Sequence, residues 1–228
     1  MSICLLVITD GRIELLDQTI KSAEAKLSGP ISHKVIINDS GHSDAFDYLM
    51  SMYGPNTYGY RIFSTGTRSG FGGAIRKAWQ YLKGQIWFDE VDYIFHLEDD
   101  FLFHRYTNLQ WMSEHLRDYP QIQQIALLRQ PWNEQEKAAG GVWQQNPEDY
   151  YPFPTDEPTM LIHRRFWTTN PCLYRAKLIL EREWPDCEHS EGIFGIELFS
   201  NPDYYSAFWG LGEEWVTHIG NERVGTGY

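Results

Sequence analysis

The chain is poor in cysteine, in basic residues and in long hydrophobic runs. Its three cysteines, Cys4, Cys172 and Cys187, are too few and too widely spaced for a disulfide framework, which is typical of a reducing compartment. No apolar run is long enough to cross a bilayer. The short run from Ile3 to Ile8 has no basic residues before it, unlike a signal peptide. The sequence therefore predicts no membrane span and a cytoplasmic location.

Basic residues are outnumbered by acidic ones. The 228 residues include 19 Lys and Arg against 31 Asp and Glu, a net charge of −12. Because phosphate binding depends on Lys and Arg, this balance argues against nucleic-acid binding through overall charge, although it leaves a local basic groove open. Apolar residues make up 42% and aromatic residues 15%, which is enough for a core and excludes wholesale disorder. The length suits a single domain.

The first hundred residues alternate between strand-like and helix-like patterns. Short apolar runs predict buried strands, and apolar residues spaced three or four apart predict helices. The expected strands are 3–8, 34–38, 60–64 and 92–97, and the expected helices are 13–27, 46–53 and 75–82. Strands joined by helices indicate a parallel sheet with right-handed crossovers.

The second half has a less regular pattern. It predicts helices at 109–116, 173–182 and 191–199, and strands at 125–128, 159–163 and 215–219. Residues 131–158 are rich in Pro, Gly, Asn, Gln, Trp and Tyr, so we expect a long loop there. The glycine-rich tail, 220–228, is expected to be irregular.

Polar, glycine-rich or acidic segments follow all four strands of the first half. They are residues 9–12, 39–41, 65–73 and 98–100. Each alone could be a solvated turn or a helix cap. Because ligands bind beyond the carboxyl ends of parallel strands, the four together indicate a site. The segment from Gly66 to Gly73 is neither a P-loop nor a dinucleotide fingerprint, yet Gly72 and Gly73 could present N–H groups to an anion.

Glu98, Asp99 and Asp100 form the sharpest local feature, because apolar residues flank them on both sides. An acidic surface turn is the alternative interpretation. Clustered carboxylates raise one another's pKa, so a cluster near the core needs a compensating cation. A hard divalent ion, Mg2+ or Mn2+, that takes oxygen ligands and bridges a diphosphate would supply that charge.

Four motifs give the chain a resemblance to GT-A-fold glycosyltransferases, of the small family-2-like type found in bacteria and phages. The motifs are residues 8–12, 36–41, 95–101 (a DxD motif in Glu-Asp-Asp form), and 216–220 with Arg223 and 227–228 after them. The resemblance implies a Rossmann-like α/β fold, with a mostly parallel sheet, helices on both faces and an irregular acceptor-side second half. It implies one domain over residues 1–228, with a nucleotide-binding half at 1–105 and an acceptor-binding half at 106–228.

The same resemblance implies roles for individual residues. Asp100 and His218 would bind the metal, Mn2+ or Mg2+. The residues expected around the nucleotide-sugar are Thr9, Asp10, Arg12, Asp39, Arg68, Gly72, Gly73, Arg76, Glu98 and Asp99. Glu191 would be the general base, at a probable helix start. It could instead complement the helix dipole, and its rivals are Asp186, Glu188, Glu197, Glu213 and Glu214.

The implied activity is inverting, metal-dependent transfer of a sugar from a nucleoside-diphosphate sugar to a hydroxyl acceptor. The acceptor stays open: a glycan, a small molecule or a hydroxymethylated base in phage DNA. For the last, the basic cluster of 163–165, Arg175 and Lys177 is the relevant feature, and a phage-encoded chain would act in the host cytoplasm. A nucleotidyltransferase and an inactive nucleotide-sugar-binding module are the alternatives. The oligomeric state is left unpredicted.

Overall fold

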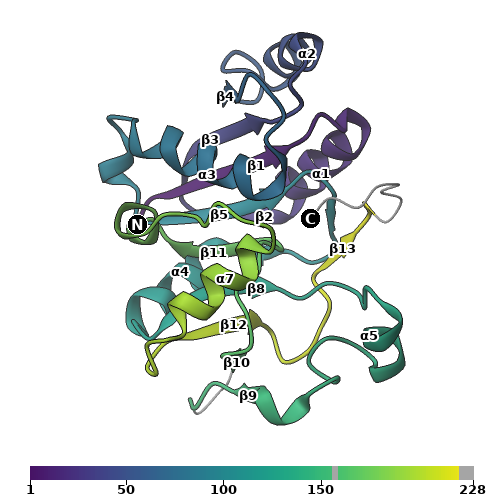
Figure 1. Cartoon of the computed structure of the whole chain (residues 1–228), viewed down its shortest axis with the longest axis vertical. Helices are drawn as coiled ribbons and strands as arrows, with labels where there is room; N and C mark the ends of the chain where they lie inside the picture. The colour runs from purple at the N-terminus through teal and green to yellow at the C-terminus, as the bar shows by residue number, and fades with distance from the viewer. Residues whose placement is uncertain (156–158, 221–228) are drawn as a thin grey trace.

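The computed structural model describes residues 1–155 and 159–220, and a nine-stranded sheet runs through it (Figure 1). In spatial order its strands are β4 (Tyr60–Ser64), β3 (Ile31–Asn38), β1 (Ile3–Thr9), β5 (Tyr93–Glu98), β11 (Cys172–Arg175), β8 (Ile122–Leu127), β12 (Tyr205–Trp209), β10 (Met160–His163) and β9 (Tyr151–Pro152). Two small sheets pair β13 (Val216–His218) with β6 (Phe101–Phe103), and β2 (Leu27–Ser28) with β7 (Thr107–Asn108).

The N-terminal half has the predicted alternation. Strands β4, β3, β1 and β5 are parallel neighbours, and α1 (Ile13–Lys26), α2 (Ser43–Tyr53) and α3 (Gly70–Lys83) connect them. Every residue of β1 is buried, as its unbroken apolar run predicts for a strand covered on both faces. All seven elements expected in this half are present, most of them longer than the apolar pattern alone indicated.

Strand β11 corrects the helix predicted over 173–182. Residues Cys172–Arg175 form a strand, antiparallel to both β5 and β8, and only Lys177–Glu181 is helical, as α6. Cys172, Leu173 and Tyr174 are all buried, because β5 and β8 flank this short segment and helices cover both faces of the sheet. A brief apolar run is compatible with a strand or a helix, so the choice depends on tertiary contacts.

The strands β2, β6, β7 and β12 also escaped prediction, and the expected loop contains more structure than predicted. Between Pro131 and Thr155 the chain forms α5 (Glu134–Ala139), the 3-10 turn η2 (Pro147–Asp149) and β9. A further 3-10 turn, η1 (Phe88–Glu90), precedes β5. Arg223, Gly227 and Tyr228 lie outside the described residues.

Helices cover both faces of the sheet, as predicted. Side chains of α1, α2 and α4 (Leu109–Asp118) belong to one buried cluster, and those of α3, α6 and α7 (Ser190–Leu198) belong to the other. Alternate residues of β5 divide between the clusters, with Phe95 in the first and Ile94 in the second. In the part of the chain that is described, no helix has the length and apolar character to span a membrane.

The register of the parallel strands brings their polar ends together. Thr9, Asn38 and Ser64, the last residues of β1, β3 and β4, are paired across the sheet, and Glu98 of β5 is paired with Ile8. The segments that follow these strands therefore meet at one edge, which is where the sequence predicted a site.

Candidate functional site

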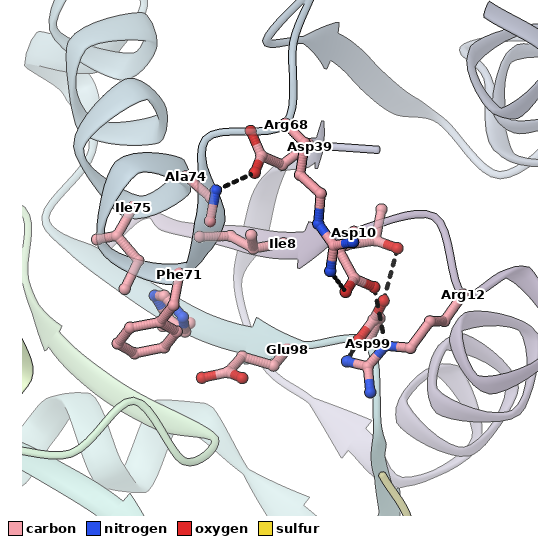
Figure 2. A pocket seen from close by; sticks show the side chains of 13 residues that line it. Ile8, Asp10, Arg12, Asp39, Arg68, Phe71, Ala74, Ile75, Glu98 and Asp99 are labelled. Atoms are coloured by element: carbon pink, nitrogen blue, oxygen red, sulfur yellow. Dashed lines mark hydrogen bonds and ion pairs between the residues drawn. The ribbon is translucent and has the colours of Figure 1, made fainter. Parts of the chain in front are cut away.

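A cavity lies at this edge and is called the strand-end cavity below. Figure 2 shows its lining, which comes from the ends of β1, β3 and β5 and from the start of α3. Of the predicted nucleotide-sugar residues, it brings together Thr9, Asp10, Arg12, Asp39, Arg68, Glu98 and Asp99. Ile8, Phe71, Ala74 and Ile75 supply an apolar wall. Most of the predicted set is thus gathered in one place.

Arg12 connects three carboxylates of this edge. Its Nε lies 2.8 Å from Asp10 Oδ1, its Nη1 lies 2.8 Å from Asp100 Oδ2, and its Nη2 pairs with Asp99. Arg12 is the N-cap residue of α1, and its side chain makes no capping hydrogen bond to the helix. The acidic cluster does have the compensating cation that its burial requires, and in this structure that cation is a guanidinium.

Gly11 allows the loop that carries Arg12 to approach β3. Its φ of +95° lies in the left-handed region, and a Cβ there would lie 2.6 Å from Ser40 Cβ. A side chain would therefore clash with Ser40 as well as strain the backbone. This close approach keeps the Thr9–Arg12 segment next to the loop that begins at Asp39.

Asp39 organises the loop before α3. Its carboxylate accepts hydrogen bonds from the backbone N–H groups of Ser69 (2.8 Å) and Gly70 (3.0 Å), and from the hydroxyls of Thr65 and Ser69. A carboxylate at this position also complements the positive end of α3. Asp39 lines the strand-end cavity as predicted, and its hydrogen bonds hold the loop that carries Arg68 over that cavity.

Gly72, Gly73 and Arg76 lie apart from the other predicted nucleotide-sugar residues. They line a separate pocket between α3 and the start of α7, where Arg76 pairs with Asp186. A Cβ on Gly72 would lie 2.7 Å from Ser190 Oγ. The absence of a side chain at Gly72 lets α3 and α7 approach each other, which is a packing reason for glycine at this position.

A second cavity, called the aromatic cavity below, adjoins the first. Phe71 and Glu98 line both cavities. The lining of the aromatic cavity includes Phe101, Arg129, Trp132, Glu136, Phe166, Trp167, Thr169, Glu191, Phe208 and His218. Two predicted residues from distant parts of the sequence, Glu191 and His218, therefore face the same space as Glu98.

Thr169 links the two glutamates of the aromatic cavity. Its hydroxyl lies 2.7 Å from Glu98 Oε1 and 3.0 Å from Glu191 Oε1, and its backbone N–H also donates to Glu191. Burial raises the pKa of Glu191, although the Thr169 hydrogen bonds oppose this. Burial raises the pKa of Glu98 to about 8, and the charge of Asp100 adds to the effect. A carboxylate with a raised pKa is a better proton acceptor, which suits Glu191 as a base.

Asp100 and His218 meet at the junction with β13. Asp100 Oδ2 lies 3.3 Å from His218 Nε2. Burial acts to raise the pKa of Asp100, but the neighbouring His218 and Arg12 outweigh it, so that the pKa is lowered. In contrast, burial raises the pKa of Asp99 to about 7, against the effects of Arg12 and Thr9.

The pair of Asp100 and His218 fits part of a metal site. Among the described residues, Asp100 Oδ1 is buried without a hydrogen-bond partner, and oxygen with imidazole nitrogen is an acceptable donor set for Mn2+. Across residues 1–155 and 159–220, no group of three or more His, Cys, Asp or Glu side chains is arranged to hold a metal ion. A metal bound here would need further ligands, which a diphosphate can supply.

The sequence reasoning assigned no individual role to Thr169 or Phe71, and it did not predict the ion pair of Arg129 with Glu136. Arg129 Nη1 lies 3.0 Å from Glu136 Oε2, and that carboxylate also accepts a hydrogen bond from the Trp132 backbone N–H. Arg129 lies over the Trp132 ring, which in turn contacts His218 edge-on. No local pattern predicts the contact of Trp132 with His218, since it joins the segment after β8 to β13.

Most side chains of the basic cluster at 163–177 are paired within the fold. His163 is buried, and Arg175 donates to backbone carbonyl oxygens of α4 and of the segment after it. Arg165 pairs with Asp149, and Lys177 pairs with Glu181. These charges are used within the fold.

No protein-family model matches the chain, and no curated protein sequence matches it. Solved structures do resemble it. S. aureus TarS 1–349 is 16% identical, with a TM-score of 0.65 over 96% of this chain and 60% of that chain. The same protein in complex with UDP-GlcNAc is 15% identical, with a TM-score of 0.64 over 99% of this chain and 60% of that one. Its complex with UDP gives 16% and 0.62, over 95% and 60%.

The chain thus spans about 60% of the length of these TarS chains. TarS is a GT-A family glycosyltransferase. The likeness includes nearly all of this chain. This chain has a GT-A-like glycosyltransferase fold, as its four motifs predicted.

Proposed function

We propose that the chain is an inverting, metal-dependent glycosyltransferase, which moves a sugar from a nucleoside-diphosphate sugar to a hydroxyl acceptor. The observation that carries this proposal is the shared wall of the two cavities, formed by Phe71 and Glu98. A nucleotide in the strand-end cavity would direct its sugar toward that wall, and an acceptor in the aromatic cavity would approach from the other side. The complexes of TarS with UDP-GlcNAc and with UDP support a donor of this class.

Residues of the strand-end cavity would bind the donor. Arg12 and Arg68 offer guanidinium groups to a diphosphate, and Arg is well suited to paired hydrogen bonds with phosphate oxygens. Thr9 and Asp99 are linked by a hydrogen bond of 2.6 Å, which fixes both side chains near the end of β1. Asp39 holds the loop of Arg68 in place through Ser69 and Gly70.

Glu191 would act as the general base. It would accept the proton of the acceptor hydroxyl while that oxygen attacks the anomeric carbon in line with the departing diphosphate, which inverts the configuration. The hydrogen bonds from Thr169 orient the carboxylate. Bound at Asp100 and His218, a divalent ion would neutralise charge on the leaving diphosphate.

The lining of the aromatic cavity defines the chemistry of the acceptor less closely than the strand-end cavity defines that of the donor. Its aromatic lining provides flat apolar faces for a sugar ring or a base, and its carboxylates outnumber its cations. We therefore propose an acceptor without a cluster of phosphates at the reacting end. A glycan, a small metabolite and a modified DNA base stay alternatives, with the last requiring a phosphate-binding surface other than the basic cluster.

A thermal-shift screen tests the proposal. Nucleoside diphosphates and their sugar conjugates are tested with and without Mn2+, because a ligand that binds only the folded state raises the melting temperature. We expect UDP or another nucleoside diphosphate to stabilise the chain, and Mn2+ to increase the effect. If no nucleoside diphosphate raises the melting temperature, the proposal fails. Sugar release from the best donor then separates a transferase from an inactive binding module.

A further inference from the structure

Arg12 neutralises the acidic cluster with all three nitrogens of its guanidinium group, each directed at a different carboxylate. Nε pairs with Asp10, Nη2 with Asp99 and Nη1 with Asp100 (Figure 2 shows the first two). The side chains of Asp99 and Asp100 are 2% and 0% exposed, whereas that of Arg12 is 22% exposed. The two aspartates are fixed in the interior, so the part of this cluster that can move is the arginine at the cavity edge.

The surroundings of Asp100 leave little room for a second cation. His218 Nε2 lies 3.3 Å from its Oδ2, and the Ile219 N–H donates to its backbone oxygen at 2.8 Å. A Cβ on Gly220 would collide with Asp100 Oδ2 and would lie 2.9 Å from Arg12 Nη1. A guanidinium group and a coordinated metal ion therefore compete for the same carboxylate oxygen.

We propose that Arg12 occupies the cation position at Asp100 in the free protein and leaves it for the diphosphate of the donor, so that nucleotide and divalent ion bind cooperatively. This inference rests on the proposed function, since it needs a diphosphate in the strand-end cavity. It makes Arg12 a positioning residue for the metal as well as a ligand of the nucleotide.

Two penalties produce the cooperativity. If a metal ion displaces Arg12 without nucleotide, the guanidinium loses a buried partner and gains only water. If a diphosphate attracts Arg12 without metal, Asp100 is left buried with His218 as its nearest partner, and an uncompensated buried charge is costly. When both ligands bind, each cation meets an anion. Thermodynamic linkage then requires that each ligand strengthens the binding of the other by the same factor.

The test measures Mn2+ binding directly, from the electron paramagnetic resonance signal of free Mn2+, with and without UDP. The proteins are the wild type, Arg12→Gln, Arg12→Lys and the control Arg117→Gln. Arg117 is an exposed residue of α4 that pairs with Asp118, at 2.8 Å. Circular dichroism confirms that each variant is folded.

We expect UDP to tighten Mn2+ binding to the wild type by about tenfold or more, within the usual range of coupling between sites. Without UDP, Arg12→Gln should bind Mn2+ about tenfold more tightly than the wild type, because nothing competes at Asp100. UDP should then tighten Mn2+ binding by a smaller factor than in the wild type, because only the direct contact of diphosphate and metal remains. Arg12→Lys keeps the charge and should resemble the wild type, and Arg117→Gln should match the wild type in the absence of UDP.

The inference is overturned if Arg12→Gln binds Mn2+ no more tightly than the wild type without UDP. If Arg12→Gln does not fold, the wild type decides: a Mn2+ affinity that stays the same when UDP is bound would also overturn the inference, because linkage requires bound nucleotide to tighten Mn2+ binding. If UDP itself fails to bind, the proposed function fails, yet a tighter Mn2+ affinity of nucleotide-free Arg12→Gln still supports competition at Asp100.

Discussion

Asp100 Oδ2 lies 3.3 Å from His218 Nε2, although more than a hundred residues separate the two in the sequence. The contact forms because β13 pairs with β6, the short strand that begins directly after Asp100. Gln130 holds β13 from the other side, since its side chain bonds to both the N–H and the carbonyl oxygen of His218, each at 2.8 Å. Strand β13 is thereby fixed over the end of β5, beside the acidic cluster.

Replacing Asp100 tests this corner as a metal site. We expect Asp100→Asn to lose the additional thermal stabilisation that Mn2+ provides in the presence of UDP, because a neutral amide is a poor ligand for a hard divalent ion. Asp118→Asn, at an exposed residue of α4 paired with Arg117, is the control and should behave like the wild type. A full Mn2+ effect in Asp100→Asn would remove Asp100 as a ligand.

Glu191 is expected to be needed for turnover and not for donor binding. Glu191→Gln should lower the rate of sugar transfer by about 100-fold or more, the usual contribution of a general base, because an amide cannot accept the proton. The stabilisation by nucleotide should be unchanged, since Glu191 lies outside the strand-end cavity. Glu197→Gln, on the exposed side of the same helix, should retain full activity. Transfer at the wild-type rate by Glu191→Gln would assign the base elsewhere.

Two glycines of α7 should respond in opposite ways to alanine. A Cβ on Gly195 would lie 2.8 Å from the Trp167 backbone nitrogen, so Gly195→Ala should lower the free energy of unfolding by about 1–3 kcal/mol through overpacking. Gly192 has open space at its Cβ position, and alanine is the better helix former there by about 1 kcal/mol. Urea unfolding of both variants measures the difference. Equal stabilities would show that α7 does not pack closely on the segment before β11.

Acid should destabilise the protein through His163. Burial lowers the pKa of His163 to about 3, and the charge of Arg165 adds to this. Between about pH 6.5 and pH 3 the unfolded chain therefore binds a proton that the folded chain excludes, and stability falls as the pH falls. At pH 5 this costs about 2 kcal/mol relative to pH 7.5.

The variant His163→Phe should lose that part of the pH dependence, because phenylalanine can stack on Phe208 as the imidazole does and carries no titrating group. Chemical denaturation at pH 5 and pH 7.5 measures the change. His96, whose pKa burial lowers to about 4, should still contribute its own pH dependence, so the slope should decrease in the variant without vanishing. His42→Gln, at an exposed position, is the control. An unchanged slope in His163→Phe would contradict the prediction.

Most predicted site residues line the strand-end cavity, whereas of the aromatic cavity the sequence predicted only Glu98, Glu191 and His218. Thr9, Asp39 and Glu98 each follow or end an apolar run, and the parallel pairing of β1, β3 and β5 brings such positions together whatever the detailed packing. Thr169 and Trp132 belong to irregular segments, where no periodicity shows which side chains face the same space. Gly72 and Gly73 were expected at the nucleotide because they start a helix, but in the fold the helix α7 lies against Gly72.

The sequence by itself determined the alternation of the first half, the edge at which its polar segments gather and the resemblance to GT-A glycosyltransferases. Those features follow from hydrophobic periodicity and chain order, which act over a few residues at a time. Only the tertiary structure decided that Arg12 balances the acidic cluster, that β11 enters the sheet as a strand, and that Thr169 joins Glu98 to Glu191. Each of these depends on contacts between distant segments, whose energies no local pattern contains.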